Sequence, residues 1–264
     1  MIHLSKDNQK ATLDKGELVG YRVGGHEYIH QKGSPGWRSS DTEMFPIIGP
    51  TAGADFEVKT PRGKALQDQH GLLRELGYEL VGHSELHAVF QKKYMANTRI
   101  KNSKFPDASS VETLFWPYTF TVEKHVQLDE NGLTITFKIS GELGMPFMLG
   151  YHPAFKLQSE NTVVEAKGSS ITIPEILAVG SRAMEIADCQ SIRLKDTKHL
   201  TITTEGFGNF MLWTEVPNML CIEPITFYPY AVEQDRLDKG FMHLDHQNTR
   251  FMIHLYPNND KDLY

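Results

Sequence analysis

The sequence predicts an all-β protein built as a large antiparallel β-sandwich. Short stretches of strand-forming residues recur along the whole chain, and turns rich in glycine separate them. No window has the 3.6-residue apolar period of a long amphipathic helix. A chain of 264 residues with 40% hydrophobic residues can bury one large core. We therefore expect a single β-sandwich domain over residues 1–264.

The first elements are predicted from turn residues. Strand-forming runs lie on both sides of Gly24-Gly25, and a glycine pair in this position is typical of a hairpin. Residues 33–41 are rich in Gly, Ser and Pro and predict a loop. The short apolar piece 45–49 follows, and the apolar spacing of residues 72–76 indicates a single helical turn.

The rest of the chain is also expected to be mainly strands. Asn131-Gly132 indicates a hairpin turn, and the apolar and polar residues that alternate after it predict a strand with one buried face. The best candidate for a short helix is 183–189. Further strands are expected at 163–164, 171–173, 200–204, 210–213, 219–222 and 251–256.

Composition excludes several classes of function. A net charge of −6 without a basic run argues against nucleic-acid binding. No apolar stretch approaches the length that spans a bilayer, and the first residues lack the apolar segment of a signal peptide. Cys189 and Cys221 are too few for a disulfide framework or a four-cysteine zinc site. We therefore expect a cytoplasmic protein without membrane or nucleic-acid partners.

Two histidines have neighbours that suit a chemical role. His152 stands directly before Pro153, which favours extended backbone and predicts a position at a strand end. An imidazole there can exchange protons near neutral pH, although a histidine that is merely hydrogen-bonded is the simpler interpretation. His70 precedes Gly71, which lets the backbone and a ligand approach closely, but a surface loop histidine fits as well.

Glu223 interrupts an apolar strand. A carboxylate between Ile222 and Ile225 is costly to bury without a partner, so it should be paired or titrate at a raised pH. A glutamate whose pKa approaches neutrality suits a general base. The alternative is a side chain that points to solvent at the strand end.

Taken together, His70-Gly71, the segment Gly-Tyr-His152-Pro-Ala-Phe and Cys-Ile-Glu223-Pro resemble the aldose 1-epimerase (mutarotase) family. The likeness covers nearly the whole chain and is greatest to the shorter, cytoplasmic branch that includes hexose-6-phosphate mutarotases. It implies a galactose mutarotase-like supersandwich with the site on a concave face. It also implies that the partner is a small-molecule sugar or sugar phosphate.

The resemblance implies a role for each residue. His152 looks like the general acid that protonates the ring oxygen of the sugar, and Glu223 looks like the base that deprotonates the anomeric hydroxyl. His70 helps to hold or protonate the ring oxygen. The pyranose opens, the C1–C2 bond rotates, and reclosure gives the other anomer. This acid–base chemistry implies no metal and no cofactor.

Two arginines are candidates for substrate binding. Many relatives carry a cation directly after the segment that matches 45–49, where this sequence has Pro50-Thr51. Arg38 matches an arginine position of the hexose-6-phosphate branch, and Arg74 also suits the likeness. Either guanidinium can hold sugar hydroxyls or a phosphate through two hydrogen bonds, or remain a surface charge.

Other clusters are discounted. His243-Leu-Asp245-His246 has metal-ligand residue types but lacks a fourth ligand and suits a polar loop. Core positions are the expected places for three aromatic residues that could otherwise stack on a sugar, namely Trp116, Trp213 and Tyr228. The rival functions are a carbohydrate-binding protein without turnover, a glycoside hydrolase that pairs Glu223 with a carboxylate such as Asp68, and a protein-interaction sandwich.

Overall fold

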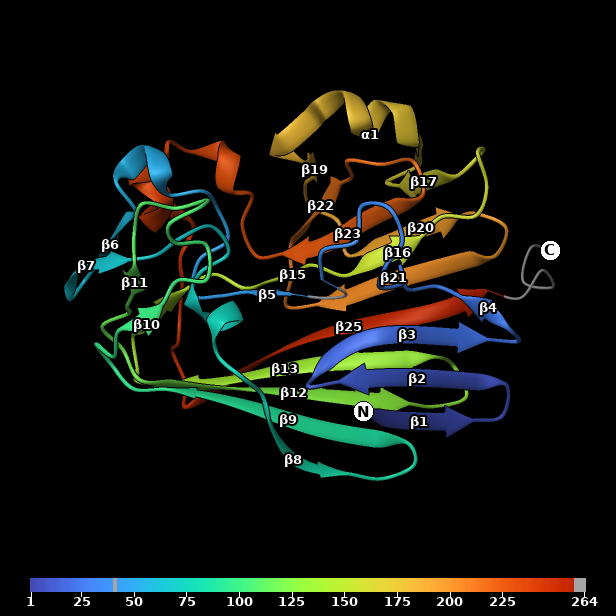
Figure 1. The fold of residues 1–264 in the computed structure, drawn as a ribbon, viewed down its shortest axis with the longest axis horizontal. Helices are drawn as coiled ribbons and strands as arrows, with labels where there is room; N and C mark the ends of the chain where they lie inside the picture. The colour runs from blue at the N-terminus through green and yellow to red at the C-terminus, as the bar shows by residue number, and fades with distance from the viewer. Residues whose placement is uncertain (40–41, 259–264) are drawn as a thin grey trace.

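A nine-stranded antiparallel sheet dominates the fold (Figure 1). The structure is a computed structural model that describes residues 1–39 and 42–258. In spatial order the nine strands are β18 (Ser169–Thr172), β17 (Val163–Ala166), β20 (Ser191–Lys195), β21 (His199–Glu205), β25 (Asn248–Asn258), β13 (Leu133–Gly141), β12 (Phe120–Leu128), β9 (His87–Tyr94) and β8 (Glu79–His83).

A second sheet contains six strands. Its order is β19 (Met184–Ile186), β22 (Asn209–Trp213), β23 (Met219–Ile225), β15 (Gly150–Tyr151) and β5 (Glu43–Met44), and β16 (Ala154–Lys156) also pairs with β23. A four-stranded sheet contains β1 (Ile2–Lys6), β2 (Gln9–Asp14), β3 (Glu17–Val23) and β4 (His26–Glu27). Three two-stranded sheets pair β6 (Glu57–Thr60) with β7 (Gly63–Leu66), β10 (Ile100–Lys101) with β11 (Thr113–Leu114), and β14 (Pro146–Phe147) with β24 (Met242–His243).

The predicted hairpins are confirmed. Gly24-Gly25 joins β3 to β4, and both glycines have positive φ, which side chains on L-residues disfavour. The turn that contains Asn131-Gly132 joins β12 to β13. Along β13 the apolar residues are buried and the polar residues between them are more exposed, as the alternation predicts.

Aromatic side chains join the nine-stranded and six-stranded sheets into a sandwich. Phe137 of β13 packs against Tyr151 of β15 with ring centroids 5.4 Å apart. Phe120 of β12 contacts Phe45, which follows β5, at 4.8 Å in an edge-to-face arrangement. These contacts belong to a core cluster that includes residues from Leu4 to Leu255. The all-β, antiparallel sandwich predicted from the sequence is confirmed.

The predicted helix is in the wrong place. Residues 183–189 contain strand β19, which pairs with β22, whereas the described part of the chain forms its one α-helix, α1, at Ile173–Val179. Thr172 and Glu175 form a capping box there, with a proline in the first turn, and these local hydrogen bonds start the helix. No helix within residues 1–39 and 42–258 has the length and apolar character needed to cross a bilayer.

The segments before the site follow the remaining predictions. The helical turn expected at 72–76 is a 3₁₀ turn over Leu72–Glu75. Of the predicted loop 33–41, residues 33–39 form turns and bends, and Ser40 and Asp41 lie outside the described residues.

Candidate active site

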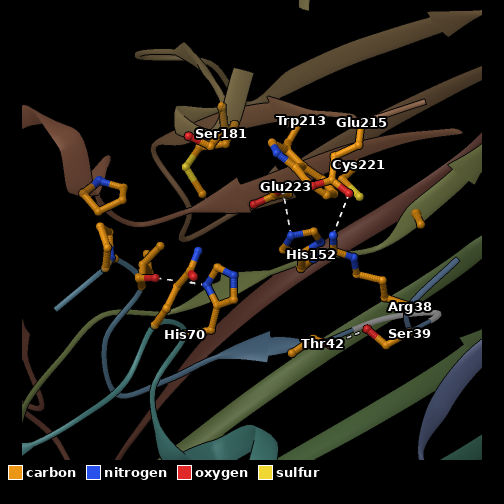
Figure 2. A pocket seen from close by; sticks show the side chains of 18 of the residues that line it. Arg38, Ser39, Thr42, His70, His152, Ser181, Trp213, Glu215, Cys221 and Glu223 are labelled. Carbon is orange, nitrogen blue, oxygen red and sulfur yellow. Dashed lines mark hydrogen bonds and ion pairs between the residues drawn. The ribbon is translucent and has the colours of Figure 1, made fainter. Parts of the chain in front are cut away.

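A cavity of about 370 Å³ opens beside the six-stranded sheet (Figure 2). Its lining comes from the loop before β5, the segment after β7, the connection between β15 and β16, and one face of β22 and β23. All five residues proposed from the sequence line it, namely Arg38, His70, Arg74, His152 and Glu223. The structure therefore brings together side chains that are up to 185 positions apart in the chain.

Strand register places His152 opposite Glu223. Gly150 pairs with Ile225 and Ala154 pairs with Cys221 in one continuous antiparallel register, so position 152 faces position 223. Nε2 of His152 lies 3.1 Å from Oε1 of Glu223, and the backbone N–H of His152 donates to the carbonyl of Thr42. His152 occupies the gap between β15 and β16, as the proline after it predicts.

Burial controls the charge of this pair. Glu223 is 1% exposed, and burial raises the pKa of its carboxyl well above the usual range. Burial lowers the pKa of His152 to about 4. Both shifts favour the neutral forms, so the pair holds one proton near neutral pH. The interpretation of Glu223 as a solvent-facing side chain is wrong, because β23 is buried along its whole length.

His70 is held in a strained turn. Its φ is +73°, and Gly71 follows with φ +72°, where a Cβ would lie 2.3 Å from the carbonyl oxygen of Phe45. Nδ1 of His70 lies 3.0 Å from the carbonyl oxygen of Ile48. Because a carbonyl only accepts, Nδ1 carries the hydrogen and Nε2 is left as an acceptor when the ring is neutral.

The rings of the two histidines contact each other in the cavity. His70 and His152 have ring centroids 5.4 Å apart in an edge-to-face arrangement. Burial, then the neighbouring His152 and Arg74, lowers the pKa of His70 well below its usual value. His70 is therefore a neutral imidazole near neutral pH and not a surface loop histidine.

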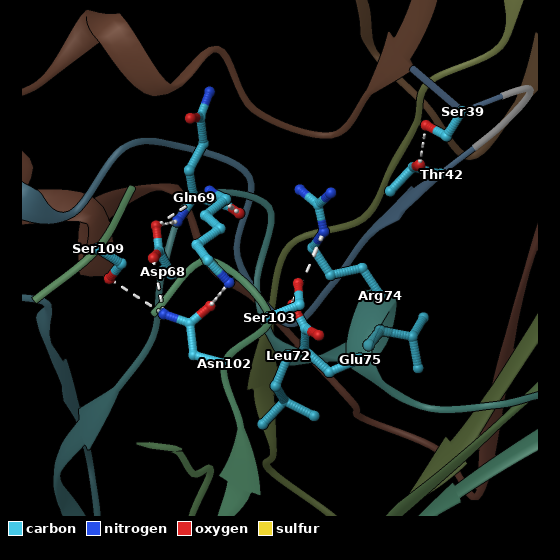
Figure 3. A network of polar contacts seen from close by, with 12 residues as sticks. Ser39, Thr42, Asp68, Gln69, Leu72, Arg74, Glu75, Asn102, Ser103 and Ser109 are labelled. Carbon is cyan, nitrogen blue, oxygen red and sulfur yellow. Dashed lines mark hydrogen bonds and ion pairs between the residues drawn. The ribbon is translucent and has the colours of Figure 1, made fainter. Parts of the chain in front are cut away.

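The two arginines differ in their partners. Arg38 is exposed and donates to Glu215 over 2.7 Å, so its charge is already matched at the mouth of the cavity. Arg74 is less exposed, and its Nε lies 3.9 Å from Glu75, a longer and weaker contact (Figure 3). Arg74 is therefore the arginine whose guanidinium is more open to a ligand.

Further lining residues were not predicted as site residues. Lys104 lines the cavity, and its Nζ lies 3.1 Å from Asp68. Asp68 also accepts a hydrogen bond from Asn102 (Figure 3). Asp68 itself does not line the cavity, which weakens its interpretation as the second carboxylate of a hydrolase. Cys221 and Glu215 also line it. Cys221 begins the Cys-Ile-Glu223-Pro motif and lies two residues before Glu223 on β23, whereas Glu215 lies in the turn between β22 and β23 and belongs to no motif named above.

Trp213 corrects one expectation. The indole lines the cavity, and its ring centroid lies 6.0 Å from that of His152, so it belongs to the site and not to the core alone. Trp116 is fully buried in the core, as expected, and Tyr228 packs against a smaller apolar cluster.

One group of donor atoms in the described residues is close enough to hold a metal ion. His152, Cys221 and Glu223 each offer one atom, and these atoms lie within 4.8 Å of one another. The segment with His243 and His246 forms no such group among the described residues.

Comparisons with known proteins bear on the family and the fold of this chain. The sequence profile of the aldose 1-epimerase family matches residues 32–209, which is more than half of the chain. A search of curated proteins gave no significant match.

Solved structures show the same fold. A galactose mutarotase-like protein from Lactobacillus casei has a TM-score of 0.78 at 17% identity, with 98% of this chain and 100% of that chain covered. A galactose mutarotase related enzyme from Lactobacillus acidophilus has a TM-score of 0.77 at 17% identity, with 98% of both chains covered. An aldose epimerase homologue from C. elegans has a TM-score of 0.68 at 12% identity, again with 98% of both covered. The chain belongs to the aldose 1-epimerase family.

Proposed function

We propose that this protein is an aldose 1-epimerase, an isomerase that interconverts the α and β anomers of a hexose or hexose phosphate. The observation that carries the proposal is the buried His152–Glu223 pair at 3.1 Å in a cavity large enough for a sugar. Family membership supports the reaction class.

The proton count of the pair suits this reaction. Ring opening removes a proton from the anomeric hydroxyl and adds one to the ring oxygen, so the catalyst ends with the number of protons it began with. Glu223 accepts the first proton, and His152 donates the second. Because the free pair shares one proton across a short contact, substrate binding needs only to move that proton from Glu223 to His152. Each step uses a side-chain proton, so the reaction as written requires no metal or cofactor.

His70 is proposed to hold the sugar rather than to protonate it. Its Nδ1–H donates to the carbonyl of Ile48, and the lowered pKa leaves Nε2 as an acceptor. An acceptor 5.4 Å from the imidazole of His152, ring centre to ring centre, can take a hydrogen bond from a sugar hydroxyl. Trp213, on the other side of His152, offers an aromatic face to the apolar side of the ring.

The cations around the mouth suggest where a phosphate would bind. Arg74 has only a long contact with the Glu75 carboxylate, at 3.9 Å, whereas Arg38 is matched by Glu215 at 2.7 Å. A phosphorylated sugar is therefore proposed to place its phosphate toward Arg74, with Arg38 contributing only after its pair with Glu215 opens. A cytoplasmic location is proposed from the two cysteines, which are both free and buried.

The proposed function is tested by anomeric equilibration. Polarimetry would start from fresh α-anomers of free and phosphorylated hexoses and compare the wild type with Glu223→Gln. Gln has nearly the same volume and still forms hydrogen bonds, but it cannot take a proton, so the rate should fall by on the order of 10²–10⁴-fold with little loss of sugar affinity. Glu205→Gln, which changes an exposed carboxylate that does not line the cavity, is the matched control and should keep most of the activity.

The outcomes separate the proposal from its rival. Full activity in Glu223→Gln would contradict the mechanism. A wild type that binds sugars but does not speed equilibration of any of them would indicate a non-catalytic carbohydrate-binding protein. Within the panel, Arg74→Ala should lower the rate of equilibration more for phosphorylated sugars than for free ones. Equal losses would indicate that Arg74 binds sugar hydroxyls.

A further inference from the structure

Cys221 gives the cavity a third metal-binding side chain beside the acid–base pair. Cys221 and Glu223 are two residues apart on β23, so their side chains leave the strand on the same face. The register of β15, β16 and β23 brings His152 opposite Glu223. Figure 2 shows the three side chains converging at one end of the cavity.

The spacing of the donor atoms fits a small divalent cation. One atom each from His152, Cys221 and Glu223 lies within 4.8 Å of the other two. Zinc binds sulfur at about 2.3 Å and imidazole nitrogen at about 2.0–2.1 Å, so tetrahedral ligands lie roughly 3.5 Å apart. Shifts of about 1 Å in the side chains would therefore close the set around an ion.

The chemistry of the donors selects the metal. A thiolate and an imidazole favour zinc and other borderline or soft cations over magnesium and calcium, which prefer oxygen ligands. Three protein ligands would leave one tetrahedral position, and because all three line the cavity, water or a sugar hydroxyl could fill it.

We propose that His152, Cys221 and Glu223 form an inhibitory zinc site in the catalytic cavity. The inhibitory effect rests on the proposed function. Zinc would occupy the lone pairs of Nε2 of His152 and of the Glu223 carboxylate, which are the atoms assigned to proton transfer. The Cys221 thiol and the protonated Glu223 carboxyl each release one proton to solvent as the Zn–S and Zn–O bonds form. Cys221 thus makes the site sensitive to zinc without a step of its own in the reaction.

Direct binding is measured first, because it does not depend on activity. The full chain, stripped with a chelator, is titrated with zinc in competition with a chromophoric chelator. We expect one zinc ion per chain in the wild type. Cys221→Ser keeps the size of the side chain but removes the thiolate. It should lower the affinity for zinc by more than about 100-fold, since loss of an outer-shell partner alone lowers metal affinity by about 10–100-fold.

The chain offers a matched control. Cys189 is the other cysteine, is also buried, and donates its thiol to the carbonyl of Ser191 away from the cavity. Cys189→Ser should bind zinc as the wild type does. Equal zinc affinity in Cys221→Ser and wild type, loss of zinc in Cys189→Ser alone, or no binding by the wild type would each overturn the site.

Inhibition is then measured as a ratio of rates with and without zinc. Saturating zinc should slow anomeric equilibration by the wild type more than about 10-fold, EDTA should restore the rate, and magnesium should have no effect. The ratio for Cys221→Ser should stay near one at the same zinc concentration. Zinc that binds the wild type and leaves its rate unchanged would overturn the inhibitory role. Failure of the proposed function would appear separately, as an inactive wild type that still binds zinc through Cys221.

Discussion

Burial sets which member of the His152–Glu223 pair holds the proton. Glu223 is buried and His152 is mostly buried, and burial moves their pKa values in opposite directions, up for the carboxyl and down for the imidazole. In the unfolded chain near pH 5.5 the same residues hold one proton as well, but on the imidazole. Folding therefore changes where the proton resides more than whether it is present, and the free enzyme keeps an acid and a base that carry no net charge.

This shared proton predicts the pH dependence of kcat/KM. Below about pH 4 His152 takes up a proton while Glu223 keeps its own, so the pair has no base and the rate falls. Above the raised pKa of Glu223 the carboxyl loses its proton, so the pair has none to donate and the rate falls again. We expect a plateau around neutrality with the acid limb well below 6.5, measured by polarimetry across pH.

The control for this profile is an exposed histidine. His243 lies in β24 and is exposed, and His243→Gln should leave both limbs unchanged. The two limbs belong to the coupled pair and not to one residue. An acid limb close to pH 6.5 would contradict the argument, because it would indicate an imidazole that titrates as in water.

At the scale of elements, a tight turn positions His70 between the strands. The backbone N–H of Phe45 donates to the carbonyl of His70, and the N–H of Leu73 donates to the carbonyl of Phe45. Gly71 lies between these bonds with its Cα against the backbone of Phe45. The 3₁₀ turn Leu72–Glu75 then carries Arg74 to the cavity.

Gly71→Ala is expected to damage both stability and activity. The backbone at φ +72° and ψ −179° disfavours any L side chain by about 1–3 kcal/mol, and the new Cβ would also meet a backbone oxygen at 2.3 Å. Gly25→Ala is the matched control, because φ is also positive (+86°) but nothing lies within 4 Å of the new Cβ. Denaturant unfolding should show the larger loss for Gly71→Ala, and only Gly71→Ala should lose activity. Equal losses of stability in the two variants would mean that the backbone of Phe45 moves away from the new Cβ at no additional free-energy cost.

At the scale of the whole molecule, a buried ionic network links the two large sheets. Glu43 of β5 contacts Lys92 of β9 and Lys124 of β12 at 3.3 and 3.0 Å. Burial raises the pKa of Glu43, but Lys124 and Lys92 outweigh it and lower the value to about 2. Lys92 also donates to the carbonyl of Leu73, in the turn that carries Arg74. We propose that residues 1–264 fold as one domain, since the core cluster includes residues near both ends.

Glu43→Gln is expected to destabilise the whole domain. Removing the carboxylate leaves two buried ammonium groups without the anion they share, and breaking a buried pair in this way costs about 3–5 kcal/mol. The control is Glu205→Gln, in an exposed pair with Arg250 that should contribute no more than about 1 kcal/mol. Unfolding followed by circular dichroism and by tryptophan fluorescence should give one shared transition for each variant. Two separate transitions would contradict a single domain.

Local sequence patterns were sufficient for most of the strands and for naming the candidate site residues. Alternation after Asn131-Gly132 and the glycine pair at 24–25 are local signals, and they predicted hairpins that the fold contains. Thr172 and Glu175 also carry a capping signal for α1, whereas the segment 183–189, for which a helix is predicted, contains the short strand 184–186. A few apolar residues without turn residues on either side do not distinguish the 3.6-residue period of a helix from the two-residue period of a strand.

The sequence by itself determined the β-rich class, the hairpin turns, and the three motifs around His70, His152 and Glu223. Only the tertiary structure decided that His152 faces Glu223, that Cys221 and Trp213 share their cavity, and that Glu215 holds Arg38 while Arg74 stays more open. The physical reason is the separation along the chain of the residues on which each feature depends. Turn chemistry and alternation depend on neighbours in the chain, whereas register between strands, and the burial that shifts a pKa, depend on residues that only folding brings together.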